Sequence, residues 1–242
     1  MSEIPAKRTV VQVVDSGLAK HGSFEDFMIQ LAARSARAGL DLHFIFPAVR
    51  SAGVKQLIET AGAKVWVVPG PWNTIGGARA MIRVLGQIRP RVADFHFGPF
   101  GAFVQVYVRC RLRGIRVFYH YHGEIRPLRT LSWTNRQVSQ LRVAALFVDR
   151  FIPVSHANAE FLRALNIRTP TDVIYNGIEI DRFRTQKSVR VSSDEIRLLS
   201  IGSMISRKRV DILLRAIKLV SERTPNVRLT LVGGGASDDY KR

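Results

Sequence analysis

Residues 10–46 read VVQVVDSGLAKHGSFEDFMIQLAARSARAGLDLHFIF, and their pattern indicates the fold class. Val10 to Val14 form an apolar run typical of a buried strand, and a polar loop with two glycines follows it. The next segment carries apolar side chains at helical spacing, and we expect Ser23 to cap that helix and Gly39 to end it. A second apolar strand follows at Leu42 to Phe46. Strand, helix and strand in this order indicate a parallel sheet.

The same unit recurs along the chain, which predicts an α/β fold with a doubly wound parallel sheet. Further strands are expected at Lys64 to Val68, Val92 to Phe97, Arg116 to His122, Phe151 to Val154 and Asp172 to Tyr175. Helical patterns separate most of these strands, as they do in Rossmann-like domains. Residues 1–184 are therefore predicted to form one Rossmann-like domain.

A polar stretch with little periodicity, residues 185–195, predicts a linker after this domain. Beyond it, Ile196 to Ile201 is typical of a strand, Val210 to Arg223 of a helix, and Val227 to Val232 of another strand. Residues 196–242 are expected to form the first βαβ unit of a second Rossmann-like domain. One such unit cannot bury a core alone, so we interpret the second domain as incomplete and the sequence as C-terminally truncated.

The charge of the chain indicates its binding partners, and its cysteine content indicates its compartment. Lysine and arginine number 37 against 19 aspartates and glutamates, and the net charge of +18 predicts attraction to anionic surfaces. The absence of zinc-finger, basic-zipper and RNA-recognition signatures favours a membrane surface over nucleic acid. The single cysteine, Cys110, excludes an intrachain disulfide and favours the cytoplasm. No signal peptide is recognised, and no apolar run reaches the roughly 18 residues of a membrane span.

Two segments carry a family resemblance. One joins FIPVSHANAEFLRALNI at 151–167 to VIYNGIEIDRFR at 173–184; the other is LLSIGSMISRKRVDILLRAIKLVSERTPNVRLTLVGGG at 198–235. Together they resemble family 4 glycosyltransferases of the GT-B fold, in which two Rossmann-like domains enclose a nucleoside-diphosphate sugar. By this resemblance the first predicted domain lies on the acceptor side, and the second binds the nucleotide sugar.

The resemblance implies a donor site in the second segment. Glycines let the backbone approach a diphosphate, and a lysine neutralises its charge, a place that Lys208 takes here. Ser203 stands where the family commonly has an arginine, which removes one cation, and Arg207 or Arg209 is a candidate replacement. The other expected donor-binding positions are Gly22, Gly202, Asn176, Gly177, Gly233 and Gly235. Asn176-Gly177 is read either as a corner lining the interdomain cleft or as a tight turn.

Three histidines are expected at the ends of strands, where open α/β sheets bind ligands. His120 and His122, in FYHYHGEIR, lie two residues apart and should point to one face. The resemblance implies that His122, before Gly123, is the catalytic residue beside the donor sugar. His120 and His96 are candidates for the acceptor side, and His120 is also compatible with a core histidine.

The expected function is sugar transfer to a glycan or lipid-linked acceptor, with retention of configuration and with neither a metal nor a cofactor. Two basic stretches, Phe103 to Arg116 and Arg126 to Arg142, predict either helices that pack on the sheet or contact with the inner face of a membrane.

Two other functions are alternatives to sugar transfer. The first alternative function is that of an inactive binding module. The second, an NAD-dependent Rossmann oxidoreductase, is disfavoured because Gly233-x-Gly235 lacks the third glycine of G-x-G-x-x-G.

Overall fold

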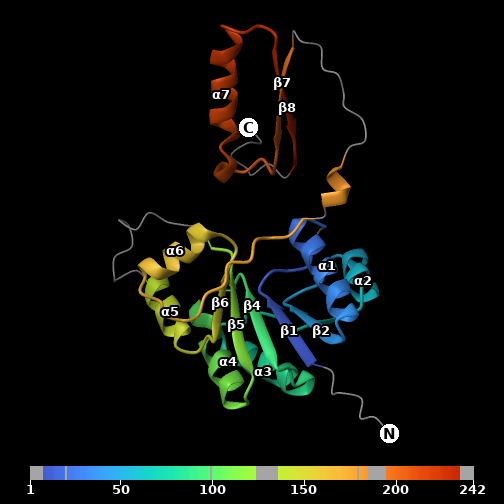
Figure 1. Ribbon diagram of the computed structural model, residues 1–242, viewed down its shortest axis with the longest axis vertical. Helices are drawn as coiled ribbons and strands as arrows, with labels where there is room; N and C mark the ends of the chain where they lie inside the picture. Colours follow the sequence, from blue (N-terminus) through green and yellow to red (C-terminus); the bar gives the residue numbers. More distant parts are fainter. Residues whose placement is uncertain are drawn as a thin grey trace. The chain divides into compact units, whose positions relative to one another are not determined.

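The computed structural model describes residues 8–19, 21–98, 100–123, 136–178, 180–184 and 195–234 (Figure 1). The chain divides into two compact units, Met1–Arg182 and Phe183–Arg242, each of which is described by itself. The predicted linker lies almost wholly outside the described residues, so the limits of the two domains stay predictions.

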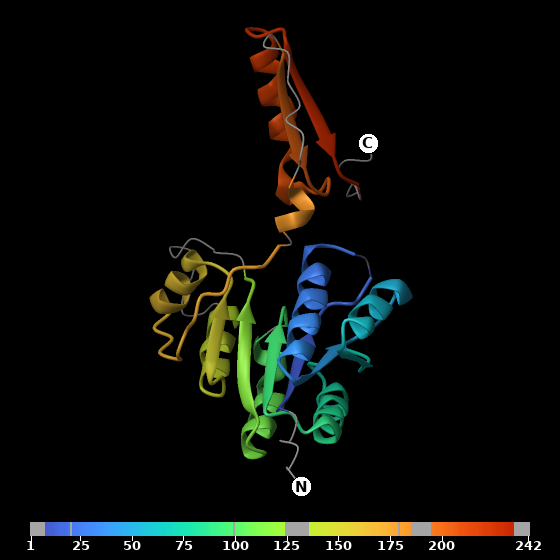
Figure 2. The same cartoon turned by 45° about the vertical axis from the view of Figure 1, so that its right-hand side comes forward.

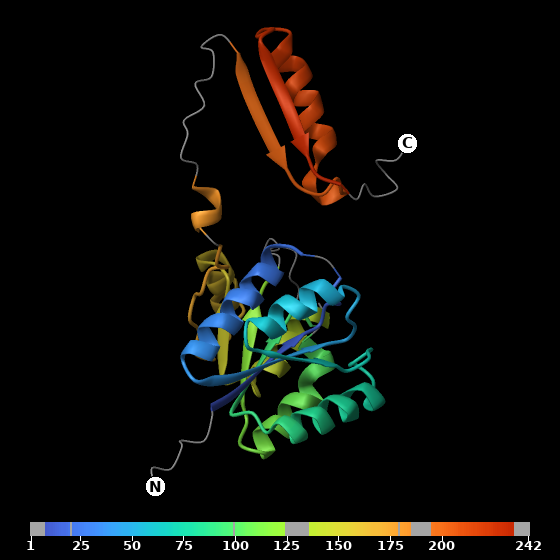
Figure 3. The ribbon, with the colours of Figure 1, turned by 90° about the vertical axis from the view of Figure 1, so that its right-hand side faces the viewer.

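The first unit is a six-stranded parallel sheet with helices on both faces (Figures 2 and 3). Its strands are β1 (Arg8–Val14), β2 (Leu40–Phe46), β3 (Lys64–Val67), β4 (Val92–His96), β5 (Arg116–Tyr121) and β6 (Arg150–Pro153). Its helices are α1 (Ser23–Arg37), α2 (Ala52–Thr60), α3 (Ile75–Ile88), α4 (Phe100–Leu112), α5 (Arg136–Ala145) and α6 (His156–Ala164). The 3-10 helix η2 (Ile180–Phe183) follows and includes the boundary between the two units. The strands lie in the order β3-β2-β1-β4-β5-β6. This order confirms the predicted Rossmann-like fold.

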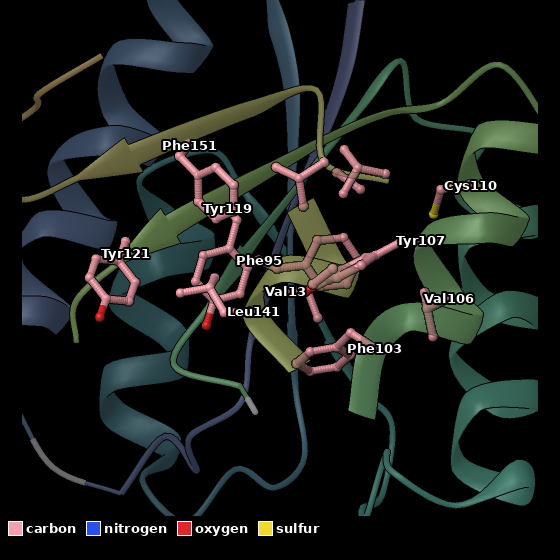
Figure 4. Close-up of a cluster of buried hydrophobic side chains, with 14 of the residues drawn as sticks. Val13, Phe95, Phe103, Val106, Tyr107, Cys110, Tyr119, Tyr121, Leu141 and Phe151 are labelled. Carbon is pink, nitrogen blue, oxygen red and sulfur yellow. The ribbon is translucent and has the colours of Figure 1, made fainter. Parts of the chain in front are cut away.

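Side chains alternate between the two faces of the sheet, and each face has its own core. Helices α1 and α2 cover the smaller core, which includes Met28, Ala32, Leu42, Phe44, Phe46, Val54 and Ile58. Helices α3 to α6 contribute to the larger core on the opposite face. At its centre the Phe95 ring meets Tyr107 edge-on at 4.8 Å and Phe103 at 5.2 Å between ring centroids (Figure 4). The apolar face of α4 is thus buried, as one interpretation of residues 103–116 predicted.

Helix α1 begins differently from the prediction. Its N-cap is Gly22, with extended backbone and no side-chain cap, so the prediction that Ser23 caps it is wrong. Glu25 and Asp26 lie in its first turn, where negative charge interacts favourably with the helix dipole. The predicted end is consistent with the structure, because the helix stops at Arg37 and Gly39 has a positive φ of 70°.

The expected strand at Asp172 to Tyr175 is also wrong. Thr171 forms a single bridge to Phe151, and no strand is assigned over residues 172–178. The segment does run beside β6, since the N–H groups of Asp172 and Ile174 donate to the carbonyls of Phe151 and Pro153. The physical reason is that β6 has only four residues and ends in a proline, which has no N–H to extend the ladder.

The second unit has the predicted βαβ form. Strand β7 (Ile196–Ile201) pairs in parallel with β8 (Val227–Val232), and the 3-10 helix η3 (Ser206–Lys208) and α7 (Val210–Ser221) connect them. Arg209, between η3 and α7, has a left-handed backbone with φ 50°. The loop after β7 therefore turns sharply before α7 begins.

Candidate functional site

The carboxyl ends of β4 and β5 bring the three predicted histidines together. His96 ends β4 and lies opposite His120 on β5, while His122 follows β5. The rings of His96 and His120 are stacked at 4.7 Å between centroids, and those of His120 and His122 at 5.1 Å. The expectation that His120 and His122 share a face fits this geometry. Their proposed roles remain predictions.

Two further side chains join the histidines in a polar network, defined here as Gln12, Asp94, His96, His120 and His122. His96 Nε2 lies 2.5 Å from Gln12 Oε1, and its Nδ1 lies 3.0 Å from His122 Nε2. Asp94 Oδ2 lies 3.2 Å from His120 Nδ1 and 3.5 Å from His96 Nε2. The network therefore runs from β1 through β4 to the end of β5.

Most of this network is buried, and burial together with the neighbouring side chains determines which of its groups are charged. Burial raises the pKa of Asp94, but the neighbouring His96 and His120 outweigh it and hold that pKa well below its usual range. Burial lowers the pKa of His96 by more than Asp94 raises it. Burial, with His96 and His120 nearby, lowers the pKa of His122 to about 3. At neutral pH Asp94 is therefore ionised, and His96 and His122 are neutral.

Aromatic rings cover the open side of the network. Phe97 stacks on His122 at 4.3 Å between centroids, and Phe24 of α1 meets the same ring edge-on at 5.6 Å. Phe97 has a positive φ of 61°, which is strained for a bulky residue. A hydrogen bond from the Gly98 N–H to the His96 carbonyl, 2.8 Å long, closes this turn. The backbone is thus bent so that Phe97 lies against His122.

Two glycines beside the histidines are required by close packing. A Cβ added at Gly98 would lie 1.7 Å from the Phe103 ring, and one at Gly123 would lie 2.4 Å from the Tyr121 ring. Tyr119 also donates its hydroxyl to the Gly98 carbonyl at 2.7 Å. The small residue after His122 therefore has a packing role in addition to its place in the family resemblance.

Gly22 lies at the start of α1, and the contact of Phe24 with His122 places this helix end beside the network. The N–H groups in the first turn of a helix have no partner within that helix, and the first regular helical bond here runs from the Asp26 N–H to the Gly22 carbonyl. The expected donor-binding role of Gly22 stays a prediction. Glu25 and Asp26, however, make this helix end unfavourable for an anion.

Asp94, His96 and His120 could also hold a metal ion, because one ligand atom from each lies within 4.8 Å of the others. Asp94 Oδ1 is buried and has no hydrogen-bond partner among the described residues. Two facing atoms of these side chains have hydrogen-bond partners without an ion, because His120 Nδ1 lies within hydrogen-bonding distance of Asp94 Oδ2, and His96 Nε2 lies within that distance of Gln12 Oε1. The expected absence of a metal remains a prediction.

In the second unit three of the predicted donor residues line a small cavity at the ends of β7 and β8. Its volume is about 60 Å³, and its lining includes Gly202, Ser203 and Lys208. The Lys208 side chain lies over Gly202, since a Cβ there would be 3.6 Å from Lys208 Cε. A Cβ at Gly233 would lie 1.8 Å from the Gly202 carbonyl oxygen, so only glycine allows the two loops to approach.

Five predicted positions are less well defined. Gly235 lies outside the described residues, and Arg207 belongs to η3 but its side chain is not described. Asn176 and Gly177 are exposed, and neither has the positive φ that the tight-turn interpretation invoked. Arg209 contacts Asp211 at 3.3 Å, so the hypothesis that it compensates for Ser203 has a competing ion pair.

Sequence reasoning missed Gln12, Asp94 and Phe97. The first two had a usable signal, since each is a polar residue inside an apolar strand, in VVQVV and VADFH. Such a residue needs a buried partner. Phe97 had no such signal, because phenylalanine rarely adopts a positive φ. Within the described part of the chain, the structure has no helix both long and apolar enough to cross a bilayer.

Comparisons with known proteins agree with this architecture. The model of Glycosyltransferase Family 4 matches residues 25–182. One subunit of the phosphatidylinositol N-acetylglucosaminyltransferase of Arabidopsis thaliana is 26% identical over 244 residues, which cover 96% of this chain and 53% of that protein. The chain thus spans about half the length of the curated relative that it matches.

Solved structures share the fold at low identity. Anabaena HepE, in complex with UDP and glucose, is 18% identical with a TM-score of 0.65, over 96% of this chain and 62% of HepE. A glycosyltransferase of Rickettsia africae is 11% identical with a TM-score of 0.64, over 94% of this chain and 69% of the other. Because the family match covers more than half of the 242 residues, the chain belongs to glycosyltransferase family 4.

Proposed function

We propose that the protein transfers a sugar from a nucleoside-diphosphate sugar to a glycan or a lipid-linked acceptor. The observation that carries the proposal is the cavity at the ends of β7 and β8, in a chain of this family. There Lys208 lies over a loop in which Gly202 and Gly233 let two backbone segments approach closely. A diphosphate needs such a cation together with accessible backbone.

The cavity suits one part of a donor rather than the whole molecule. Its 60 Å³ is well below the roughly 300 to 1,000 Å³ of pockets that enclose drug-sized ligands. We assign it to the diphosphate, because the lining also includes Val210, the first residue of α7, where helix N–H groups favour negative charge. The one acidic residue in this first turn, Asp211, is paired with Arg209. HepE was solved with UDP, which makes a uridine diphosphate sugar the first donor to test.

The histidine end of the first unit is assigned to the sugar and the acceptor. His122 is half-buried and neutral at physiological pH, so it offers a hydrogen bond and no net charge. Departure of the diphosphate builds negative charge that Lys208 and backbone dipoles of the donor loop would stabilise. We further propose retention of anomeric configuration and no metal ion, as the family resemblance implies.

A lipid-linked acceptor accords with two observations. The curated relative is named for a transfer to phosphatidylinositol, and this chain has a net charge of +18, which attracts anionic lipid surfaces. The basic stretch proposed for membrane contact, residues 126–142, lies mostly outside the described residues. Peripheral attachment to the inner face of a membrane therefore stays part of the proposal.

Donor binding is tested by calorimetric titration with UDP-glucose, UDP-N-acetylglucosamine, a GDP-sugar and an ADP-sugar. Lys208→Ala should weaken binding of the preferred donor about tenfold to a hundredfold, as expected for losing one charged contact. Lys218→Ala is the matched control, because Lys218 is an exposed lysine in the last turn of α7. Equal losses in both variants would remove Lys208 from the donor site.

Catalysis is tested by incubating the preferred donor with soluble glycans and with lipid acceptors in vesicles. Transfer to a lipid acceptor that rises with anionic lipid content would support the acceptor and membrane assignments together. Donor binding without transfer to any acceptor would favour the alternative of a binding module. No binding of any nucleotide sugar by folded protein would contradict the proposed function.

A further inference from the structure

The polar network controls which ring nitrogen of His122 carries a proton. A neutral imidazole donates from one nitrogen and accepts at the other, and its neighbours decide which. His122 Nε2 lies 3.0 Å from His96 Nδ1, whereas His122 Nδ1 has no hydrogen-bond partner among the residues that the structure describes. The state of that outer nitrogen therefore depends on the far side of His96.

The far side of His96 faces two acceptors. Its Nε2 lies 2.5 Å from the side-chain oxygen of Gln12 and 3.5 Å from Oδ2 of Asp94. An ionised carboxylate can only accept, and the Gln12 amide presents its oxygen. His96 must therefore carry its proton on Nε2, with an unshared electron pair on Nδ1.

The tautomer of His96 in turn determines the tautomer of His122. Since Nδ1 of His96 accepts, the neighbouring Nε2 of His122 must donate. A neutral His122 then has no proton on Nδ1. The stacked Phe97 ring, 4.3 Å away, and the edge of Phe24 restrict rotation of the imidazole about its side-chain bonds.

We propose that Gln12, Asp94 and His96 are positioning residues that fix His122 as a hydrogen-bond acceptor through Nδ1. The ligand group that this atom takes is a neutral hydroxyl, as on a sugar, and not a phosphate, whose lone pairs would repel it. The identity of that hydroxyl as one of the transferred sugar or acceptor rests on the proposed function. The tautomer itself does not, because it follows from contacts within the first unit.

Ring-nitrogen NMR reads the tautomer directly. Long-range ¹H–¹⁵N spectra of the 242-residue chain with ¹⁵N-labelled histidine, recorded at about pH 7.5, separate Nε2–H, Nδ1–H and averaged imidazoles. Loss of one signal set in His96→Gln and in His122→Gln assigns the two residues. We expect His96 and His122 each to show a single Nε2–H form.

Two substitutions of Gln12 should give opposite results. Gln12→Glu presents only acceptors to His96 and should leave both tautomers unchanged. Gln12→Met has similar length but no acceptor, and it leaves His96 Nε2 only the longer contact of 3.5 Å to Asp94, so the two ring nitrogens of His122 should shift part of the way towards averaged values. If tryptophan fluorescence shows that Gln12→Met does not fold, Asp94→Asn replaces it. The Asn amide can donate to His96 Nε2, so the Nδ1–H form of His96, and with it the Nδ1–H form of His122, should become populated.

Three results would overturn the proposal. The first is a wild-type His122 that carries its proton on Nδ1. The second is a folded Gln12→Met or Asp94→Asn variant whose His122 signals match those of the wild type. The third is a stoichiometric shift of the His96 and His120 signals on adding zinc chloride, reversed by a chelator, which would assign the network to a metal ion.

Transfer kinetics separate this proposal from the proposed function. If sugar transfer is observed, Gln12→Met should lower kcat about tenfold, with a smaller change in KM for the donor, and Gln12→Glu should restore kcat. Unchanged kcat in a folded Gln12→Met variant with averaged tautomers would overturn the positioning role. Wild-type protein that transfers no sugar but shows the expected tautomers would refute only the proposed function.

Discussion

Acidification should destabilise the first unit well above the pH at which its carboxyl groups titrate. The cause is His122, whose pKa is lowered from 6.5 to about 3 by burial and by the neighbouring His96 and His120. Between these two pH values the unfolded chain binds a proton that the folded chain does not. Stability contributed by neutral His122 is therefore complete above about pH 6.5 and is lost as the pH falls towards about 3.

The size of the effect follows from the shift. Each pH unit below 6.5 lowers the free energy of unfolding by about 1.4 kcal/mol for one such histidine. His122 alone should therefore lower it by about 2 kcal/mol by about pH 5. His96 acts in the same direction, because burial lowers its pKa as well. Asp94 has a depressed pKa, and its contribution is lost only below its ordinary pKa of 3.8, which is lower than the pH of about 5 considered for His122.

Urea unfolding followed by tryptophan fluorescence measures this loss from about pH 4.5 to about pH 7.5. All three tryptophans, Trp66, Trp72 and Trp133, belong to the first unit, so the signal reports that unit. His122→Gln should reduce the slope of the free energy of unfolding against pH by about 1.4 kcal/mol per pH unit near pH 5. His156→Gln makes the same substitution at an exposed histidine of α6 and serves as the control.

Parallel curves for the wild type and His122→Gln would contradict this prediction, because they would show that His122 binds its proton equally well in the folded and unfolded states. A wild-type stability that stays constant between about pH 7 and about pH 5 would refute it for His96 as well.

Three further predictions concern packing and reactivity. Gly98→Ala should lower the free energy of unfolding by about 2 to 3 kcal/mol, because its Cβ would lie 1.7 Å from the buried Phe103 ring, whereas Gly53→Ala in open space on α2 should raise it by about 0.5 kcal/mol; urea unfolding checks both. Tyr107→Phe should be neutral or stabilising by up to about 1 kcal/mol in the same assay, because the Tyr107 hydroxyl is buried and no described residue bonds it. Burial raises the pKa of Cys110 from 9.0 to about 12, so native protein at about pH 8 should react with iodoacetamide about a thousandfold more slowly than unfolded protein, as followed by mass spectrometry; equal rates would contradict this.

The fold was predictable because its signals are local. Apolar strands alternate with helical patterns, and Gly39 follows the end of the first helix as expected. The errors also have local causes. Ser23 has the composition of a cap, but Gly22 takes that place, and Asp172 to Tyr175 has strand composition but adjoins a short strand that ends in proline.

The candidate site was predictable only in part. Strand-end position identified His96, His120 and His122, because parallel sheets bind ligands where their strands end. Gln12 is 84 residues from His96 in sequence, and only the pairing of β1 with β4 brings them together. The left-handed backbone at Phe97 opposes the preference of that residue type, so composition could not indicate it.

The polar network also protects the sheet from mispairing while it folds. In β4, Asp94 and His96 point to one face and Ala93 and Phe95 to the other. A shift of one residue against β1 and β5 would exchange the two sets. It would place an ionised carboxylate among the aromatic rings of α4 and Phe95 among the histidines, at a cost of several kcal/mol. Sheets in which β4 is shifted by one residue are therefore less stable than the native sheet, whether or not any ligand is bound.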